Sequence, residues 1–266
     1  MDISVSGPRV YVRIEWLYDK TKDSIASIFG NFGNLITQTT VSLFAVTILL
    51  MILAVAVTRN LTKRPGRLQV VVEKVVNMLY GLVEDTMGKH NAKFAPYIGT
   101  LFLCSIFGSL IGTTMIFRSA TADLSVTLAW ALVTSGMVWY NNIKNFGFKA
   151  WLKGFTEPIA VMTPMNVVSE IAQPLSMAFR HFGNVAGGSV LTTLIYSALA
   201  AASNLLFRWI SAIAMPPLLQ AGVPAFLSLY FDFFSGFVQA FVFCLLTMVY
   251  VAGACPSPEE IAQTNE

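Results

Sequence analysis

The chain alternates between long apolar runs without charge and shorter charged connections. The first run, residues 39–58 (TTVSLFAVTILLMILAVAVT), contains no charged side chain. Twenty residues of α-helix are about 30 Å long, which matches the hydrocarbon core of a bilayer. The run therefore predicts a membrane-spanning helix that ends just before Arg59.

Four further runs have the length and apolar character of membrane helices. Residues 95–117 and 124–142 predict a second and a third span, joined by the turn RSATAD. The last two runs, residues 166–206 and 224–253, would be about 60 Å and 45 Å long as helices, more than a perpendicular crossing needs. We expect these two helices to tilt strongly and to form a hairpin.

One segment has a different pattern. Between residues 68 and 87, apolar side chains recur at helical spacing opposite Glu73, Lys74 and Asn77. A helix of this kind lies on a membrane surface instead of crossing it. Residues 146–165, which include aromatic side chains and two prolines, predict a further interfacial segment.

Basic residues give the predicted orientation. The connection from residue 59 to 93 is rich in Lys and Arg, so the positive-inside rule makes it cytoplasmic. Lys144, Lys149 and Lys153 mark a second cytoplasmic connection. The N-terminal segment, residues 1–35, is then outside, and the C-terminal tail, residues 254–266, is cytoplasmic.

Composition agrees with this architecture. Hydrophobic residues make up 55% of the chain and charged residues 12%, with a mean hydropathy of +0.66. Soluble domains carry roughly 25% charge, so the sequence predicts an all-α membrane protein of about five spans plus one surface helix. The net charge of +3 is no signature of nucleic-acid binding. The three cysteines lack metal or disulfide spacing, and no nucleotide, metal or hydrolytic motif is found, so neither a cofactor nor a catalytic residue is predicted.

The most informative residue is Arg180, which lies in a long apolar run. A guanidinium stays protonated, and placing it among hydrocarbon costs at least about 2.5 to 3.5 kcal/mol. Either Arg180 has a function in the membrane, or it snorkels or forms a static ion pair with Glu170 or Asp232. A purely structural scaffold does not explain this cost.

Other polar residues share helical faces in the two long segments. Asn184, Gly187 and Gly188 follow Arg180 at i+4, i+7 and i+8, where they would form one small and polar stripe. Asp232, Gly236 and Gln239 fall at i, i+4 and i+7 of the last long segment. Such an acid either protonates, pairs with Arg180 or lines water, whereas Gln239 alone is as consistent with a hydrogen bond between helices.

Three more positions offer titratable or polar groups. His181 could carry protons, or its ring could simply bind a backbone carbonyl; Ser189 lies near the same flank. Asp123 could mark a polar entrance on the outer side or cap the helix that follows it. Glu157 and Glu170 could line an exit on the cytoplasmic side, or they are solvated there.

Three motifs in these segments carry a family resemblance. The run PLSMAFRHFGNVAGG, residues 174–188, resembles the signature helix of subunit a of F-type ATP synthases. VQAFVFCLLTMVYV, residues 238–251, is similar to that family's last helix, and SATADLSVTLAWAL, residues 119–132, to its outer turn and helix. The motifs occur in the family's order and cover most of the chain from residue 39.

The resemblance implies a non-catalytic, ion-translocating stator subunit in a bacterial plasma membrane, with no nucleotide bound by this chain. Arg180 would be the stator arginine, facing a rotating c-ring whose subunits carry carboxylates, and subunit b of the peripheral stalk would be a further partner. Asn184 and Gln239 match the polar residues beside the arginine. Asp232 and Asp123 match positions of the outer half-channel.

Two positions depart from the family's pattern. Ser189 stands where many members have Glu, and His181 stands where Leu is usual. We expect Asp232, alone or with His181, to replace the missing Glu. The coupling ion, H⁺ or Na⁺, stays open at this point.

A secondary transporter that binds an anionic substrate at Arg180 is the alternative. The lack of inverted repeats and the few charges within the membrane argue against it.

Overall fold

The computed structural model describes residues 10–13, 34–59, 66–114, 117–157, 159–207 and 229–257. Three predicted segments lie partly outside this range. They are most of the N-terminal segment 1–35, the start of the last long helix at 224–228, and the end of the tail from residue 258.

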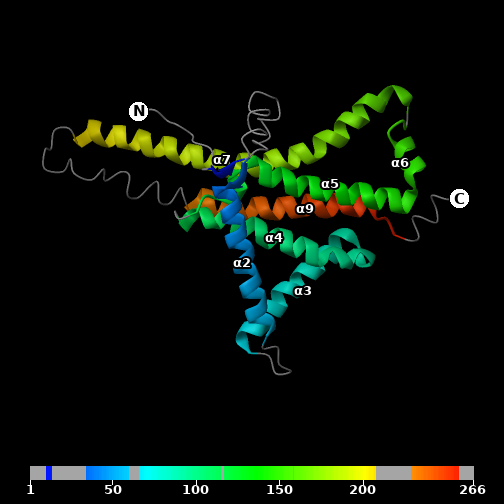
Figure 1. Ribbon diagram of the computed structural model, residues 1–266, viewed down its shortest axis with the longest axis horizontal. Helices are drawn as coiled ribbons and strands as arrows, with labels where there is room; N and C mark the ends of the chain where they lie inside the picture. Colours follow the sequence, from blue (N-terminus) through cyan, green and yellow to red (C-terminus); the bar gives the residue numbers. More distant parts are fainter. Residues whose placement is uncertain are drawn as a thin grey trace. The chain divides into compact units, whose positions relative to one another are not determined.

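The described residues are mostly helical, which confirms the predicted all-α class (Figure 1). Short 3₁₀ turns connect several helices, and a π-helical stretch, η6 (Leu229–Ser235), precedes the last one. In addition, two short strands, β1 (Val10–Arg13) and β2 (Asn34–Thr37), pair antiparallel. The helices are α2 (Gln38–Thr58), α3 (Arg67–Met87), α4 (Ala95–Leu110), α5 (Leu124–Phe146), α6 (Phe148–Gly154), α7 (Thr163–Phe207) and α9 (Gly236–Ala254).

Within the described residues, four helical segments are long and apolar enough to cross a membrane: Gln38–Thr58, Lys89–Thr114, Thr163–Ala202 and Phe233–Ala254. The chain is therefore a multi-pass membrane protein. Helix α5 has 23 residues but is not among the four, because Asn141, Asn142 and Lys144 make its second half more polar. The third span stays a prediction.

The chain forms two units. Unit 1 contains residues 1–43, 105–124 and 180–239, and unit 2 contains residues 44–104, 125–179 and 240–266. Helices α4, α7 and α9 contribute residues to both units. Each unit is described by itself below.

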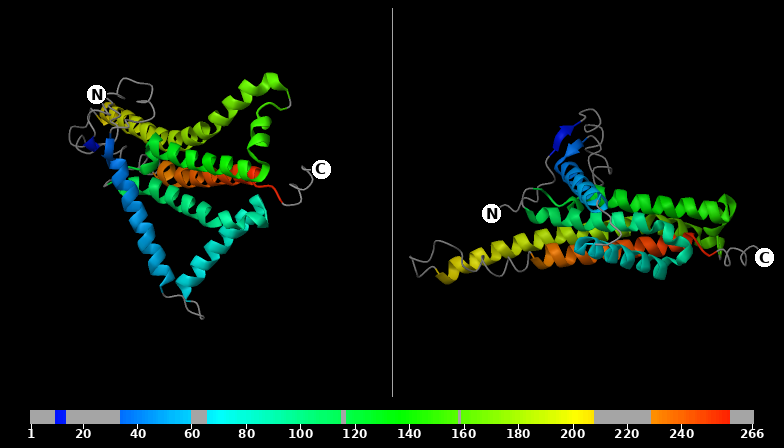
Figure 2. Two further views of the ribbon diagram at one scale, coloured as in Figure 1. Left: turned by 45° about the vertical axis from the view of Figure 1, so that its right-hand side comes forward. Right: turned by 90° about the horizontal axis from the view of Figure 1, so that it is seen from below.

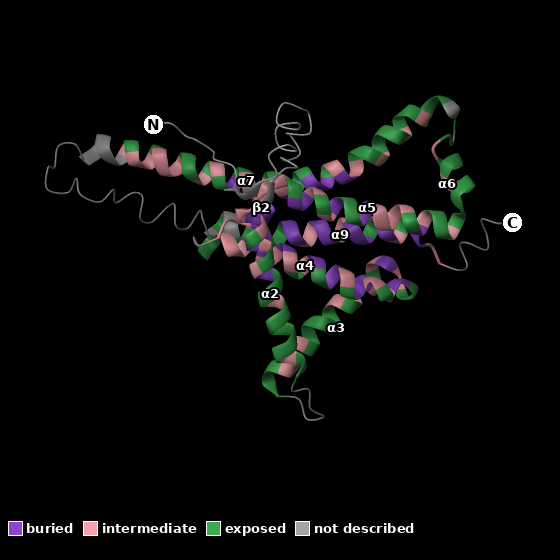
Figure 3. Ribbon diagram, viewed as in Figure 1, coloured by how far each residue is buried: buried purple, intermediate pink, exposed green. Residues whose placement is uncertain are grey.

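The core of unit 2 lies where α4, α5 and α9 run side by side (Figures 1 and 2). Phe243 and Met248 of α9 and Ile98 of α4 are fully buried there, and the Cys244 thiol lies 3.9 Å from the Ile98 carbonyl. Helices α2 and α3, in contrast, are mostly exposed, as Figure 3 shows. Phe44 and Met51 of α2 are 66% and 62% exposed, as expected for side chains that contact lipid.

Three side chains fix the C-terminal end of α9. The last carbonyls of a helix have no partner within the helix. Here Asn145 donates to the Ala254 carbonyl at 2.8 Å, and Asn91 donates to the Cys255 carbonyl at 2.9 Å, where the His90 ring also lies 2.9 Å away. The end of α9 is thus anchored to α5 and to the turn before α4.

Candidate functional site

Arg180 lies on an exposed stripe of α7. Gly183, Gly187, Leu191 and Leu194 share its side of the helix at i+3, i+7, i+11 and i+14, and all are exposed. A Cβ atom added at Gly183 or Gly187 would meet nothing within 4 Å among the described residues. This arginine stripe is therefore open to contact from outside the chain.

No side chain that the structure describes forms an ion pair or hydrogen bond with the Arg180 guanidinium. Glu170, one of the two predicted partners, instead accepts a hydrogen bond from the indole of Trp139. Asp232, the other, lies in the π-helical stretch η6, and its side chain is outside the described part of the structure.

Asn184, one turn after Arg180, joins α7 to the start of α9. Its amide donates to Gln239 Oε1 at 3.4 Å, and its carbonyl oxygen accepts a bond of 2.8 Å from the Ser235 hydroxyl. Gln239 is only 6% exposed, and its Nε2 makes no hydrogen bond to a described residue. The three side chains, Asn184, Ser235 and Gln239, form an amide cluster next to the arginine stripe.

His181 points away from that stripe and into unit 1, where it is fully buried. Its Nε2 lies 3.2 Å from the hydroxyl of Ser105 on α4, and the ring also bonds to the backbone of Gln239. A side-chain hydroxyl and a backbone group thus both contact this histidine.

A line of buried hydroxyls continues from Ser105. Ser109 lies one turn further on α4, donates to the Ser105 carbonyl at 2.9 Å, and contacts the Thr121 hydroxyl at 2.9 Å. A Cβ atom at Gly236 would lie 3.2 Å from the Ser109 Cβ, so only a small residue allows this approach. Sequence reasoning missed these hydroxyls, although the i, i+4 spacing of Ser105 and Ser109 in an apolar run is a usable signal.

Two predicted site residues lie apart from the amide cluster. Asp123 accepts a bond of 3.0 Å from the Thr39 hydroxyl, which links the turn before α5 to the start of α2. The Ser189 hydroxyl is exposed and donates to the Ala186 carbonyl of its own helix at 2.7 Å.

Two predicted helical faces need correction. Gly187 is exposed but Gly188 is buried, so the predicted stripe does not include Gly188. Asp232 lies in π-helical geometry, whose bonds run from i to i+5. The α-helical spacing used to place Asp232, Gly236 and Gln239 on one face therefore does not apply before Gly236.

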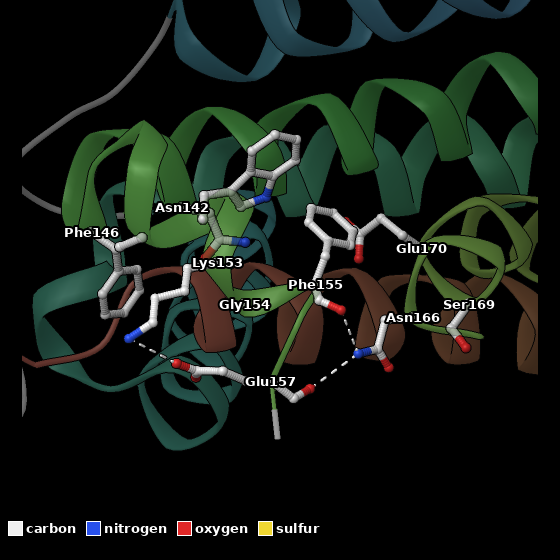
Figure 4. Close-up of a pocket in the computed structure, with 11 residues that line it drawn as sticks. Asn142, Phe146, Lys153, Gly154, Phe155, Glu157, Asn166, Ser169 and Glu170 are labelled. Carbon is white, nitrogen blue, oxygen red and sulfur yellow. Dashed lines mark hydrogen bonds and ion pairs between the residues drawn. The ribbon is translucent and has the colours of Figure 1, made fainter. Parts of the chain in front are cut away.

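Glu170 lies in unit 2, in the wall of an open cavity of about 760 Å³ between α5, α6 and the start of α7 (Figure 4). The polar side chains that line it are Asn142, Lys153, Glu157, Asn166, Ser169 and Glu170. We refer to it as the polar cavity.

Comparison with known proteins decides the family. The family model described as ATP synthase A chain matches residues 39–252. The chain belongs to this family.

Curated relatives of the ATP synthase A chain family cover nearly the whole chain. One is "ATP synthase subunit a, sodium ion specific" of Propionigenium modestum, 31% identical over 96% of this chain and 87% of the relative. "ATP synthase subunit a 1" of Crocosphaera subtropica is 33% identical over 88% of this chain and 93% of the relative. "ATP synthase subunit a" of Moorella thermoacetica is 30% identical, over 82% and 90%.

These matches confirm the resemblance seen in residues 174–188, and none of them favours a secondary transporter. The chain is a membrane-embedded member of the ATP synthase A chain family, a family of ion-transporting subunits. Its long apolar helices are consistent with a place in the membrane.

Proposed function

We propose that this chain is the ion-conducting stator subunit of an ATP synthase and that its arginine stripe faces the ring of c subunits. The observation that carries the proposal is the exposed Arg180 beside Gly183 and Gly187, with no described side chain to pair with it. A helix of the ring that carries a carboxylate would provide an anion for Arg180 and a surface that packs against the two glycines. The chain itself catalyses no bond formation and binds no nucleotide.

Arg180 acts by electrostatics. A guanidinium remains charged in apolar surroundings, so it attracts each ionised carboxylate of the ring as that carboxylate arrives. An ion that enters from the outer side neutralises the carboxylate, which then moves into lipid, and the ion leaves on the inner side after nearly a full turn. The fixed charge blocks direct leakage between the two half-channels. Each charge that crosses 100 mV releases about 2.3 kcal/mol.

The amide cluster supports this role. The bonds of Asn184 to Gln239 and Ser235 connect α7 to α9 one turn from the arginine. Because the Asn184 amide is hydrogen-bonded to Gln239 and Ser235, it would keep this part of α7, and with it the arginine stripe, in a fixed orientation as the ring passes. The Nε2 of Gln239 is buried and makes no hydrogen bond to a described residue, so only water or a group that enters the cluster could bind it.

The outer half-channel would use Asp123, Asp232 and His181. His181 is fully buried, and the hydroxyls of Ser105, Ser109 and Thr121 extend the polar surface beside it. This supports the idea that His181, with Asp232, replaces an acid at position 189. The Ser189 hydroxyl would contribute only after it leaves the Ala186 carbonyl.

The inner half-channel would open through the polar cavity in whose wall Glu170 lies. In this proposal the N-terminus lies outside and the C-terminus in the cytoplasm of a bacterial plasma membrane, and subunit b is a second partner. The coupling ion is H⁺ or Na⁺; one relative is named as sodium ion specific.

The deciding experiment is ATP synthesis by the complete complex in proteoliposomes under an imposed ion gradient. Arg180→Ala is expected to abolish synthesis, whereas Arg67→Ala on the exposed end of α3 should keep it. Normal synthesis by the Arg180→Ala complex would contradict the proposal. Running the assay with a pH gradient and then with a sodium gradient identifies the ion.

A further inference from the structure

The polar cavity contains two carboxylates with different surroundings. Glu157 is 62% exposed and pairs with Lys153, itself 75% exposed, at 3.4 Å. Both lie at the rim in Figure 4, where Asn166 donates to the carbonyls of Phe155 and Glu157 at 2.9 and 3.1 Å. Exposed pairs of this kind contribute little and exchange easily with water. Glu157 is thus a solvated rim residue.

Glu170 is different because it lies at the boundary of two cavities. It is half-buried, and it lines both the polar cavity and a neighbouring apolar cavity of about 350 Å³. Trp139, Trp151 and Phe155 also line the apolar cavity, together with Val167 and Ile171. Without a fixed donor, such a carboxylate would rotate fully towards the water of the polar cavity.

Trp139 supplies that donor. Its indole Nε1 bonds to Glu170 Oε1, and an indole N–H can only donate. The bond therefore occupies one oxygen in both protonation states and leaves Oε2 to take or release an ion. The other groups that line the polar cavity are Lys153 and Glu157 near α6, Asn142 of α5, and Asn166 and Ser169 of α7.

We infer that Trp139 is a positioning residue that holds Glu170 at the inner mouth of the ion path, with one carboxylate oxygen directed to the polar cavity. The inference rests on the proposed function, because it treats this cavity as part of that path.

The test uses passive ion flux through the complete complex in proteoliposomes, with the pH varied on the cavity side. Trp139→Phe keeps the ring but removes the donor, which stabilised the ionised carboxylate. The pH of half-maximal flux should rise by about half a unit to one unit. Trp151→Phe, in the wall of the same apolar cavity but without a bond to Glu170, is the matched control and should not move the midpoint.

Glu170→Gln should remove this pH-dependent phase, and Trp139→Phe should then have no further effect. An unshifted midpoint in Trp139→Phe, or the same shift in the Glu170→Gln background, would each overturn the inference. Loss of ATP synthesis in Arg180→Ala would persist in that case, so failure of the inference is distinguishable from failure of the proposed function.

Discussion

The Asn184 amide donates a hydrogen bond of 3.4 Å to Gln239 Oε1, and this contact joins α7 to α9 one turn beyond Arg180. The same side chain accepts a bond from Ser235. Both bonds link α7 to a segment more than 50 residues later in the chain, at or just before the start of α9. The position of the arginine stripe therefore depends on α9 through Asn184.

Asn184→Ala should therefore uncouple the complex partly without preventing assembly. The change leaves the buried amide of Gln239 and the half-buried hydroxyl of Ser235 without this partner, at a cost of about 1 to 3 kcal/mol. We expect a several-fold slower ATP synthesis in proteoliposomes. Thr193→Ala, on the same helix, removes only a bond to the Ser189 carbonyl and is the control. Equal rates in the two variants would contradict this role of Asn184.

Arg180→Lys should not restore the activity lost in Arg180→Ala. A lysine ammonium loses its proton more readily when it is desolvated, and the barrier between the half-channels disappears with the charge. ATP-driven ion pumping and ion-driven ATP synthesis measure this directly. Pumping at the normal rate by the lysine variant would show that any cation suffices at this position.

Gly187→Leu should stop rotation without destabilising the chain. A Cβ atom at this position meets no described atom within 4 Å, and Leu is a better helix former than Gly. It would, however, project from the arginine stripe into the path of the ring. ATP-driven pumping should fall to background. Gly136→Leu on α5, where an added Cβ atom also meets no described atom within 4 Å, should pump normally. If both variants pump, the stripe does not face the ring.

Cys255 should resist alkylation at neutral pH. It is buried at the anchored end of α9, and burial raises the pKa of its thiol. Since the thiolate is the reactive form, labelling should be slow at pH 7 and accelerate as the pH rises towards the thiol pKa. The measurement is maleimide labelling of a variant with alanine at Cys104 and Cys244.

Asn91→Ala removes the bond to the Cys255 carbonyl, and it should speed this labelling at pH 7. A cysteine placed at the exposed Thr156 gives the rate of an accessible thiol. If Cys255 reacts as fast as that reference, the end of α9 is not held as described.

The sequence predicts the helical class well, because uncharged runs of membrane length leave few alternatives to a helix. Residues 39–58 illustrate this, since the helix found there is Gln38–Thr58. The π-helical stretch before Gly236 could not be predicted in this way, because apolar periodicity does not distinguish i+4 from i+5 bonding. For the same reason the α-helical spacing used to place Asp232 on the face of Gln239 does not hold for that stretch, and their shared face stays a prediction.

In the site, too, some residues could be predicted from the sequence and others could not. Arg180 stands out in the sequence because charge is expensive in an apolar run. Its neighbours Ser105 and Ser235 do not, since a hydroxyl in a membrane helix usually bonds to its own backbone. Only the packing of α4 against α7 within unit 1 shows that Ser105 contacts His181. The pair Trp139 and Glu170 likewise depends on a contact between α5 and α7 that no spacing in the chain reveals.

The two glycines of the arginine stripe have a mechanical consequence. Side chains on a sliding surface must change rotamer as each neighbour passes, and every such change adds a barrier to the motion. Gly183 and Gly187 present bare backbone to the space in front of them. Next to these glycines, the friction felt by a passing rotor would then come mainly from the charge of Arg180, so the torque there would vary once per c subunit and in step with the ion that the subunit exchanges.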